Sequence, residues 1–307
     1  MTNNTLRITT KRPLPPDEAD FAIFIEFKKG EGDPLRVFRA ADQTIKALQI
    51  LDRAFCESID NNIKPVMVLE DIEAGSLKIW LRNILTATDD QAIKSLNWKP
   101  AVGKYLVRAK YAFVEWANKS DGRASLPELV SGLRRIAEET DVKHLPDYAP
   151  TNTQDIIAAT KELTAAKGAL IEGDSMKYLS SITEPADFDL AVVIDPISLE
   201  EMAIKETTKF ENMQMNLVVK KPDYLGDSKW ELRHGKKSIS ARINDSDWLR
   251  RFQARQVDVR PGDALKCAVT VEYGYGFDNE LVRENYTVEQ VVKVLENQIS
   301  DQGRLLP

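Results

Sequence analysis

The chain has 307 residues, of which 43% are hydrophobic and 29% are charged, the composition of a globular protein long enough for two ordinary domains. Its 42 basic and 48 acidic residues give a formal net charge of −6, which argues against affinity of the whole chain for polyanions but allows a local basic patch. The two cysteines, Cys56 and Cys267, lie far apart and outside any paired motif, which argues against a disulfide framework or a structural zinc site.

The opening residues, MTNNTLRITTKRPLPP, lack the apolar stretch of a signal peptide. No run of about 18 apolar residues predicts a membrane span. We therefore expect a cytoplasmic protein that does not associate with a membrane.

The first part of the chain predicts the order β-α-β-β. In FAIFIEFKK, residues 21–29, the side chains alternate with the period of a strand. Asp33 is expected to cap the following helix, in which apolar residues form one stripe as far as Ile59. Residues 66–85, VMVLEDIEAGSLKIWLRNIL, predict a hairpin. This order buries a helix against one face of a small sheet.

Further helices are expected over 97–120, 126–140 and about 153–172, where apolar residues recur at intervals of three and four. The stretch between the last two contains two prolines and little periodicity, which is typical of a boundary. We therefore expect an N-terminal α+β domain over 1–150 and a helical connector over 151–204.

Beyond the connector the pattern changes to short strands separated by turns. FDLAVVID at 188–195 is strand-like and precedes this region, and similar segments follow at 213–222, 260–276 and 285–295. Such spacing predicts a C-terminal, mainly antiparallel β module over 205–300, either a small barrel or a sandwich. The expected fold class of the whole chain is α+β.

The segment SKWELRHGKKSISARINDSDWLRRF, residues 228–252, contains seven Lys or Arg and only three acids. As a hairpin it places its apolar side chains on one face and its charges on the other, with Glu231 expected opposite Arg242. Asp245 is expected to cap the short helix that follows. The basic residues form either a solvated face or a site that binds polyanions. The polyanion-binding candidates are Arg233, Lys236, Lys237, Arg242, Arg250 and Arg251.

A second candidate site lies near the N-terminus. In PPDEADFAIFIEFKKG, Pro16-Asp17 and Glu26-x-Lys28 resemble the motif of PD-(D/E)xK nucleases. The resemblance implies that Asp17 and Glu26 hold a divalent metal ion and that Lys28 helps to activate water. Only fifteen residues precede Pro16, whereas that family has a helix and a strand before its Asp, so an ordinary strand is the favoured interpretation.

Phosphate-loop, dinucleotide-binding and nucleophile–base patterns do not occur, so we expect no cofactor and no resident metal. The elements around Trp230, Ser240-Ala241, INDSDWL and RPGDAL are similar to a module of uncharacterised bacterial proteins. The segments DPLRVFRA, LQILDRAF and LEDIEAGSLKIWL are similar to the domain that precedes such modules. This resemblance implies a two-domain architecture near mobile or phage-defence genes, and no functional residue.

The sequence therefore favours a protein without enzymatic activity that interacts with or regulates a protein partner, or forms a homo-oligomer, in a bacterial defence-type complex. The alternative is a nucleic-acid binder acting through 229–260, or the metal-dependent nuclease described above. A third prediction is a small-ligand sensor whose pocket is rimmed by Tyr105, Trp116 or Trp248.

Overall fold

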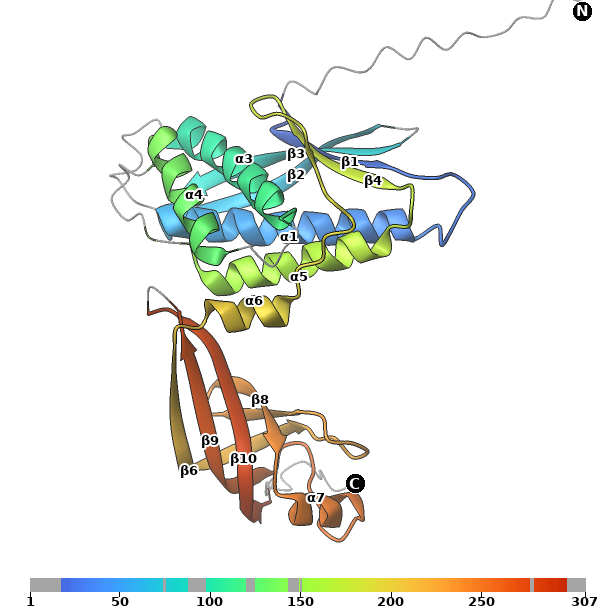
Figure 1. Ribbon diagram of the computed structural model, residues 1–307. Helices are drawn as coiled ribbons and strands as arrows, with labels where there is room; N and C mark the ends of the chain where they lie inside the picture. Colours follow the sequence, from blue (N-terminus) through green and yellow to red (C-terminus); the bar gives the residue numbers. More distant parts are fainter. Residues whose placement is uncertain are drawn as a thin grey trace, which may run out of the picture. The chain divides into compact units, whose positions relative to one another are not determined.

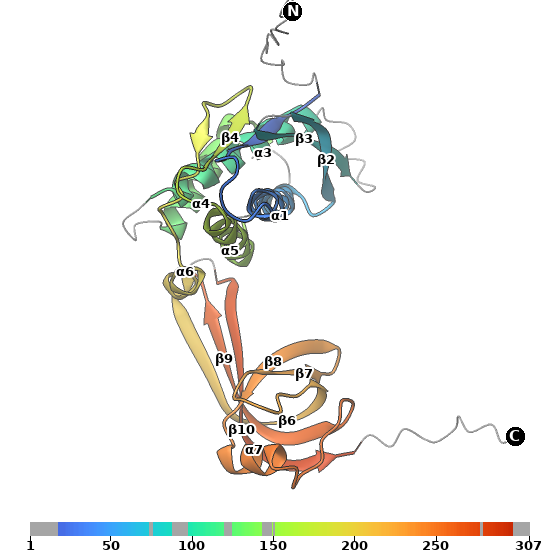
Figure 2. The same ribbon diagram turned by 90° about the vertical axis from the view of Figure 1, so that its right-hand side faces the viewer.

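The computed structural model describes residues 18–73, 76–87, 98–119, 125–142, 149, 151–276 and 279–296. Two compact units divide the chain after Glu201. Within the described residues, the first unit holds a five-stranded sheet with helices, and the second holds five strands closed into a barrel (Figures 1 and 2). The predicted α+β class is confirmed.

The first unit begins with a strand, a long helix and two further strands. In chain order its elements are β1 (Phe21–Glu26), α1 (Arg36–Ile59), β2 (Ile63–Glu73), β3 (Leu77–Ala87), α3 (Trp98–Ala117), α4 (Leu126–Glu139), α5 (Thr153–Ala169), β4 (Ser175–Ser180) and β5 (Ala186–Asp187). The helix α6 (Pro196–Ala203) crosses the division between the units.

β1 lies at the centre of the sheet, whose strand order is β2-β3-β1-β4-β5. Phe21, Ile23 and Ile25 alternate along it and are fully buried, as a central strand requires. α1 and α3 lie on one face of the sheet (Figure 1). The sheet contacts α3 through side chains: the Tyr178 hydroxyl donates to the Val107 carbonyl, and Lys110 lies over the Phe21 ring.

The segment 151–204, expected to be a helical connector, instead contributes α5, which packs along α1, and β4, which pairs with β1. The sequence did not predict β4, because SMKYLS is short and only Met176 and Tyr178 mark its buried face. Conversely, 188–195 is not a strand. Its backbone carbonyls at Val192 and Ile194 accept hydrogen bonds from side chains of α5 instead of pairing with another strand.

The predicted start of α1 was two residues too early. Asp33 accepts a hydrogen bond from the Leu35 amide at 3.0 Å, and the helix begins at Arg36, after that local turn. The side chain of Asp33 is used in a turn before the helix, as short acidic side chains often are.

The second unit is a barrel with one short helix. Its elements are β6 (Glu206–Lys221), β7 (Trp230–His234), β8 (Lys237–Ile243), α7 (Ser246–Gln253), β9 (Ala264–Tyr275) and β10 (Leu281–Leu295). In the closed order β10-β8-β7-β6-β9, β8 and β10 are parallel and the other neighbours are antiparallel. Counted within the unit, the strands close in the order 1-2-3-5-4, with the helix between the third and fourth. This is the connectivity of an OB-fold.

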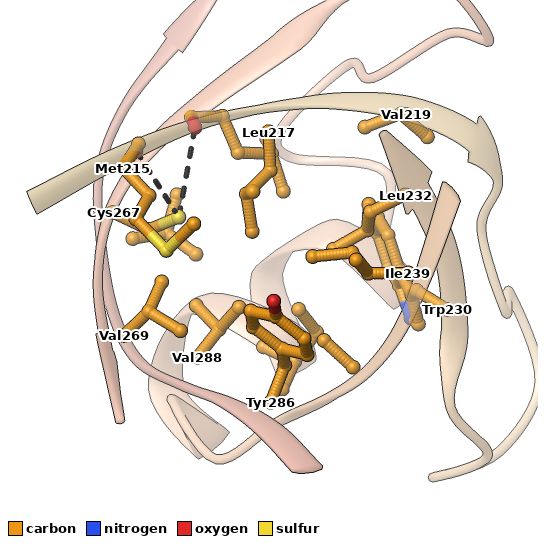
Figure 3. Packing of buried hydrophobic residues seen from close by; sticks show 14 of the residues in the cluster. Met215, Leu217, Val219, Trp230, Leu232, Ile239, Cys267, Val269, Tyr286 and Val288 are labelled. Atoms are coloured by element: carbon orange, nitrogen blue, oxygen red, sulfur yellow. Dashed lines mark hydrogen bonds between the residues drawn. The ribbon is translucent and has the colours of Figure 1, made fainter. Parts of the chain in front are cut away.

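The barrel core confirms the predicted hairpin. Trp230 and Leu232 from β7 and Ile239, Ala241 and Ile243 from β8 are buried. Figure 3 shows several of these side chains packed inside the barrel with side chains of β6, β9 and β10. The turn between β7 and β8 contains Gly235 at a φ of 58°, a conformation that favours glycine.

α7 closes one end of the core. Its predicted cap is confirmed, because the Asp245 side chain accepts a hydrogen bond from the Trp248 amide at 3.0 Å. The rings of Trp248 and Phe252 are parallel with centroids 5.7 Å apart, and Trp230 lies 4.9 Å from Phe252. These aromatic contacts anchor the helix to the hairpin.

Candidate polyanion-binding face

The basic candidates divide between two places on the barrel. Arg233 and Arg242 point outward from β7 and β8, and Lys236 and Lys237 lie at the turn between these strands. Two further candidates, Arg250 and Arg251, lie on α7. In an OB-fold the face formed by the second and third strands is a common ligand-binding surface. Here those strands are β7 and β8, so four of the six candidates lie on or at the rim of that face.

Ion pairs neutralise part of this face. Lys237 pairs with Glu284 of β10, and Arg242 lies 3.9 Å from Asp227. The predicted Glu231–Arg242 pair is wrong, because Glu231 is opposite Ser240 and lies 3.9 Å from Lys221. Arg233 and Lys236 form no ion pair with any residue that the structure describes. The face therefore keeps an excess of positive charge.

Sequence reasoning missed two lysines that extend this face. Lys220 and Lys221 end β6, which pairs with β7, and the Lys220 ammonium donates to the Ser238 hydroxyl at 3.0 Å. Their position in the sequence could have revealed them. They end the strand just before the hairpin, and consecutive strands of a β meander pair with each other. Lys, Arg and Ser side chains are the usual donors to phosphate oxygens.

At one end of the hairpin, a polar hollow of 350 Å³ opens beside Arg242. Lys229 and Lys209 add positive charge to its lining, and the acids Glu272 and Glu289 oppose it. The remaining lining residues are Asn244, Thr270, Asn285, Tyr286 and Thr287. This surface offers many hydrogen-bond donors and little apolar area, which suits a hydrated anionic ligand.

The loop between β6 and β7 is held by hydrogen bonds within the loop and by a ring contact with α7. Hydrogen bonds from the Ser228 hydroxyl and from backbone amides, those of Leu225 and Ser228 foremost, lower the pKa of Asp223 to about 2. The Tyr224 ring stacks on Phe252 with centroids 5.0 Å apart. In OB-folds the equivalent loop borders the ligand.

The nuclease candidates do not form a metal site within the described residues. Asp17 lies outside them, so the full set stays an untested prediction. Glu26 is exposed at the end of β1, and the structure describes no cluster of three or more potential metal ligands. Lys28 has a structural environment: its amide donates to Asp174 at 2.9 Å, and its carbonyl accepts from Arg36 at 2.9 Å.

The three aromatic residues predicted to rim a ligand pocket are core residues. Tyr105, Trp116 and Trp248 are 0%, 3% and 4% exposed. Their rings contact Phe55, Phe113 and Trp230 respectively, which explains their burial.

The two thiols are poor nucleophiles. Burial raises the pKa of Cys267 to about 12, and burial, followed by the nearby Asp52 carboxylate, raises the pKa of Cys56 well above its usual range. Lys167 is also buried, and desolvation lowers its pKa to about 8. Its ammonium donates to the Ala117 carbonyl at the end of α3 and to the Val192 carbonyl, so it has a structural role.

No family model, curated protein or solved structure matches this chain. The similarity to bacterial two-domain proteins therefore stays a prediction. Among the helices that the structure describes, none is both long and apolar enough to cross a bilayer.

Proposed function

We propose that the protein binds nucleic acid through the basic outer face of β7 and β8. One observation supports the proposal: Arg233 and Arg242 point outward from β7 and β8, with Lys236 at the turn between them, and in OB-folds the face of the corresponding strands is the one that binds oligonucleotides. Fold alone does not imply function, but the positive charge of this face favours an anionic ligand. Arg233 and Lys236 lack acidic partners within the described part of the chain, and each can neutralise a phosphate.

The test is a titration of labelled single-stranded and double-stranded oligonucleotides at several salt concentrations. Each phosphate contact makes the slope of log K against log salt more negative, by about 0.7 for a single strand and about 0.9 for a duplex. We expect Arg233→Gln/Lys236→Gln to weaken binding and to make the slope on a single strand less negative by about 1.4. Arg134→Gln/Arg135→Gln removes the same charge from the exposed side of α4 and serves as the control.

Absence of binding at low salt would overturn the proposal. Equal losses in the two double variants would do so as well, because they would show a general effect of net charge instead of a site.

Protein contact, the function first predicted from the sequence, is the second candidate. It is favoured by apolar side chains along the edge strand β2, where Val66, Leu69 and Ile72 are 52%, 57% and 53% exposed. Pro65 and the register shift after Leu69 disrupt the strand edge, so the side chains and not the backbone would make the contact. Sedimentation of the wild type and Leu69→Glu tests this, and a wild type that stays monomeric and captures no partner from its host contradicts it.

A further inference from the structure

The barrel carries a three-stranded extension, which we call the arm. It consists of residues 206–213 of β6, 271–275 of β9 and 281–286 of β10. β7 pairs with β6 only from Val218, and β8 pairs with β10 from Tyr286, so the arm continues beyond the β7–β8 hairpin (Figures 1 and 2).

Three aromatic side chains stand on one face of the arm. Phe210 is directly paired with Val271, whose side chain lies in the barrel core, and directly paired residues share a face. Tyr273 and Tyr275 follow Val271 at a period of two and therefore lie on this inner face. The centroids of Phe210 and Tyr273 are 5.9 Å apart, and those of Tyr273 and Tyr275 are 6.4 Å apart. We call these three residues the aromatic row.

The aromatic row is accessible. Phe210 is 48% exposed and the two tyrosines are partly exposed. A register shift follows Phe210, and Asn212 has a φ of 56° within it. Such a bulge bends a strand and redirects its side chains. Met215 and Leu217, further along β6, enter the barrel core, whereas Phe210 remains at the surface.

The opposite face of the arm carries a glycine packed against an isoleucine and an ion pair. Gly274 lies against Ile204, since a Cβ added to it would be 2.7 Å from the Ile204 Cδ1 atom. On the same face Arg283 and Glu272 form an ion pair at 3.2 Å. The accessible rings are thus confined to the inner face.

The basic turn of the hairpin lies beside this inner face. Lys237 pairs with Glu284, which is opposite Tyr273, and its ammonium is 6.0 Å from the centre of the Tyr286 ring. Burial alone would raise the pKa of Glu284, but hydrogen bonds from Lys237 and the Tyr286 hydroxyl lower it, so its charge offsets that of Lys237. Lys236 adjoins Lys237 in this turn, and Arg233 points outward from β7 just before it.

We propose that the aromatic row stacks the bases of a single nucleic-acid strand whose phosphates contact Lys236 and Arg233. Aromatic rings beside cationic side chains are the combination by which proteins hold single strands without base preference. A duplex hides the faces of its bases, so the arm selects single strands. This inference rests on the proposed function and names its substrate class.

The test compares Phe210→Ala with the wild type on a single-stranded oligonucleotide and on its duplex. Stacking on one ring contributes enough that we expect about 5-fold or greater loss of single-strand affinity, with little change for the duplex. The salt slope should stay that of the wild type, because no phosphate contact is lost. Phe210→Trp should retain or improve the affinity. Phe38→Ala on α1, where the phenylalanine is 64% exposed, is the matched control.

Should Phe210→Ala fail to fold, Phe210→Leu keeps an apolar side chain without a ring and should show the same selective loss. Wild-type single-strand affinity in a folded Phe210 variant, together with a loss in Arg233→Gln/Lys236→Gln, would overturn base stacking and leave the proposed function standing. If the wild type binds neither nucleic acid, both proposals fail.

Discussion

The two units of the molecule differ in whether their cores contain charged side chains. In the first unit, Lys110 and Asp52 are 0% and 2% exposed and their charged atoms lie 2.6 Å apart. Arg36 and Asp174 form a second buried pair at 3.0 Å. The core cluster of the barrel consists of aliphatic, aromatic and sulfur-containing side chains.

Connectivity explains the difference. Each barrel strand is hydrogen-bonded to a neighbour on both sides, so the closed ladder itself fixes the register. The helices of the first unit have no such ladder against the sheet. Its buried pairs join residues 58 and 138 positions apart in the chain. Burying charges costs desolvation energy, and the pair is satisfied in only one arrangement. We infer that these pairs position α1, α3 and the end of the sheet more than they stabilise the unit.

The largest expected effect comes from removing one partner of the deepest pair. Lys110→Met leaves the Asp52 carboxylate unpaired in the core and should lower the unfolding free energy of the first unit by about 3–5 kcal/mol. Desolvation already raises the pKa of Asp52, and loss of Lys110 raises it further, so the deficit should be smaller in acid, where the carboxyl is neutral. Urea unfolding at two pH values measures this.

The matched control is Lys110→Met/Asp52→Leu, in which no charge is buried. It should recover most of the lost stability, as replacement of whole buried pairs often does. The unfolding transition of the barrel should not change in either variant. A double variant as unstable as the single one would show that the pair contributes packing or hydrogen bonding that an apolar pair does not replace.

A smaller effect is expected at the second pair. Burial alone would raise the pKa of Asp174, but hydrogen bonds from Arg36 and from the amides of Lys28 and Ile171 lower it below 3.8. Because the pKa of Asp174 is lower in the folded state than in the unfolded state, its ionisation stabilises the fold above the unfolded pKa. This stabilisation is lost as the pH falls through the folded pKa. Asp174→Asn should cost about 2 kcal/mol at neutral pH.

The difference between Asp174→Asn and the wild type should therefore shrink in acid below about pH 4, which unfolding across a pH series would reveal. Asp42→Asn removes an exposed carboxylate that pairs with Lys46 at 2.6 Å, and it should change stability by less than about 0.5 kcal/mol. If Asp174→Asn lowered the unfolding free energy equally at every pH, the loss would not come from ionisation of this carboxylate.

The sequence predicted the barrel better than the first unit, because the hairpin of the barrel depends on local contacts, whereas the first unit depends on contacts between distant parts of the chain. Alternation in the segment from Trp230 to Ile243 is local, and it correctly assigned the buried side of the hairpin and the cap at Asp245. The role of β4 depends on pairing with β1, more than a hundred residues earlier, and six residues of mixed polarity do not indicate such a partner. The buried pairs were missed because Lys110 and Asp52 look like ordinary polar positions on their helices.

The candidate site was predictable only in part. The basic residues of β7 and β8 follow from composition and strand direction, but Lys220 joins them through the barrel's pairing. The aromatic row could not be found from spacing alone, since Phe210 and Tyr273 lie on different strands and meet through their register. Whether an aromatic side chain on a strand is buried or accessible depends on where the neighbouring strands end.

The smallest expected effect tests the claim that steric fit, and not charge, positions the parts of the second unit. Gly274→Ala would place a Cβ 2.7 Å from the Ile204 Cδ1 atom and should lower the barrel's unfolding free energy by about 1–2 kcal/mol. In an Ile204→Ala background the same substitution should cost less, because the obstructing atoms are gone, and a double-mutant cycle measures the difference. Gly168→Ala, on the helix α5 of the first unit with no atom within 4 Å of its added Cβ, should be neutral or slightly stabilising. An equal cost of Gly274→Ala in both backgrounds would show that backbone conformation, and not contact with Ile204, requires the glycine.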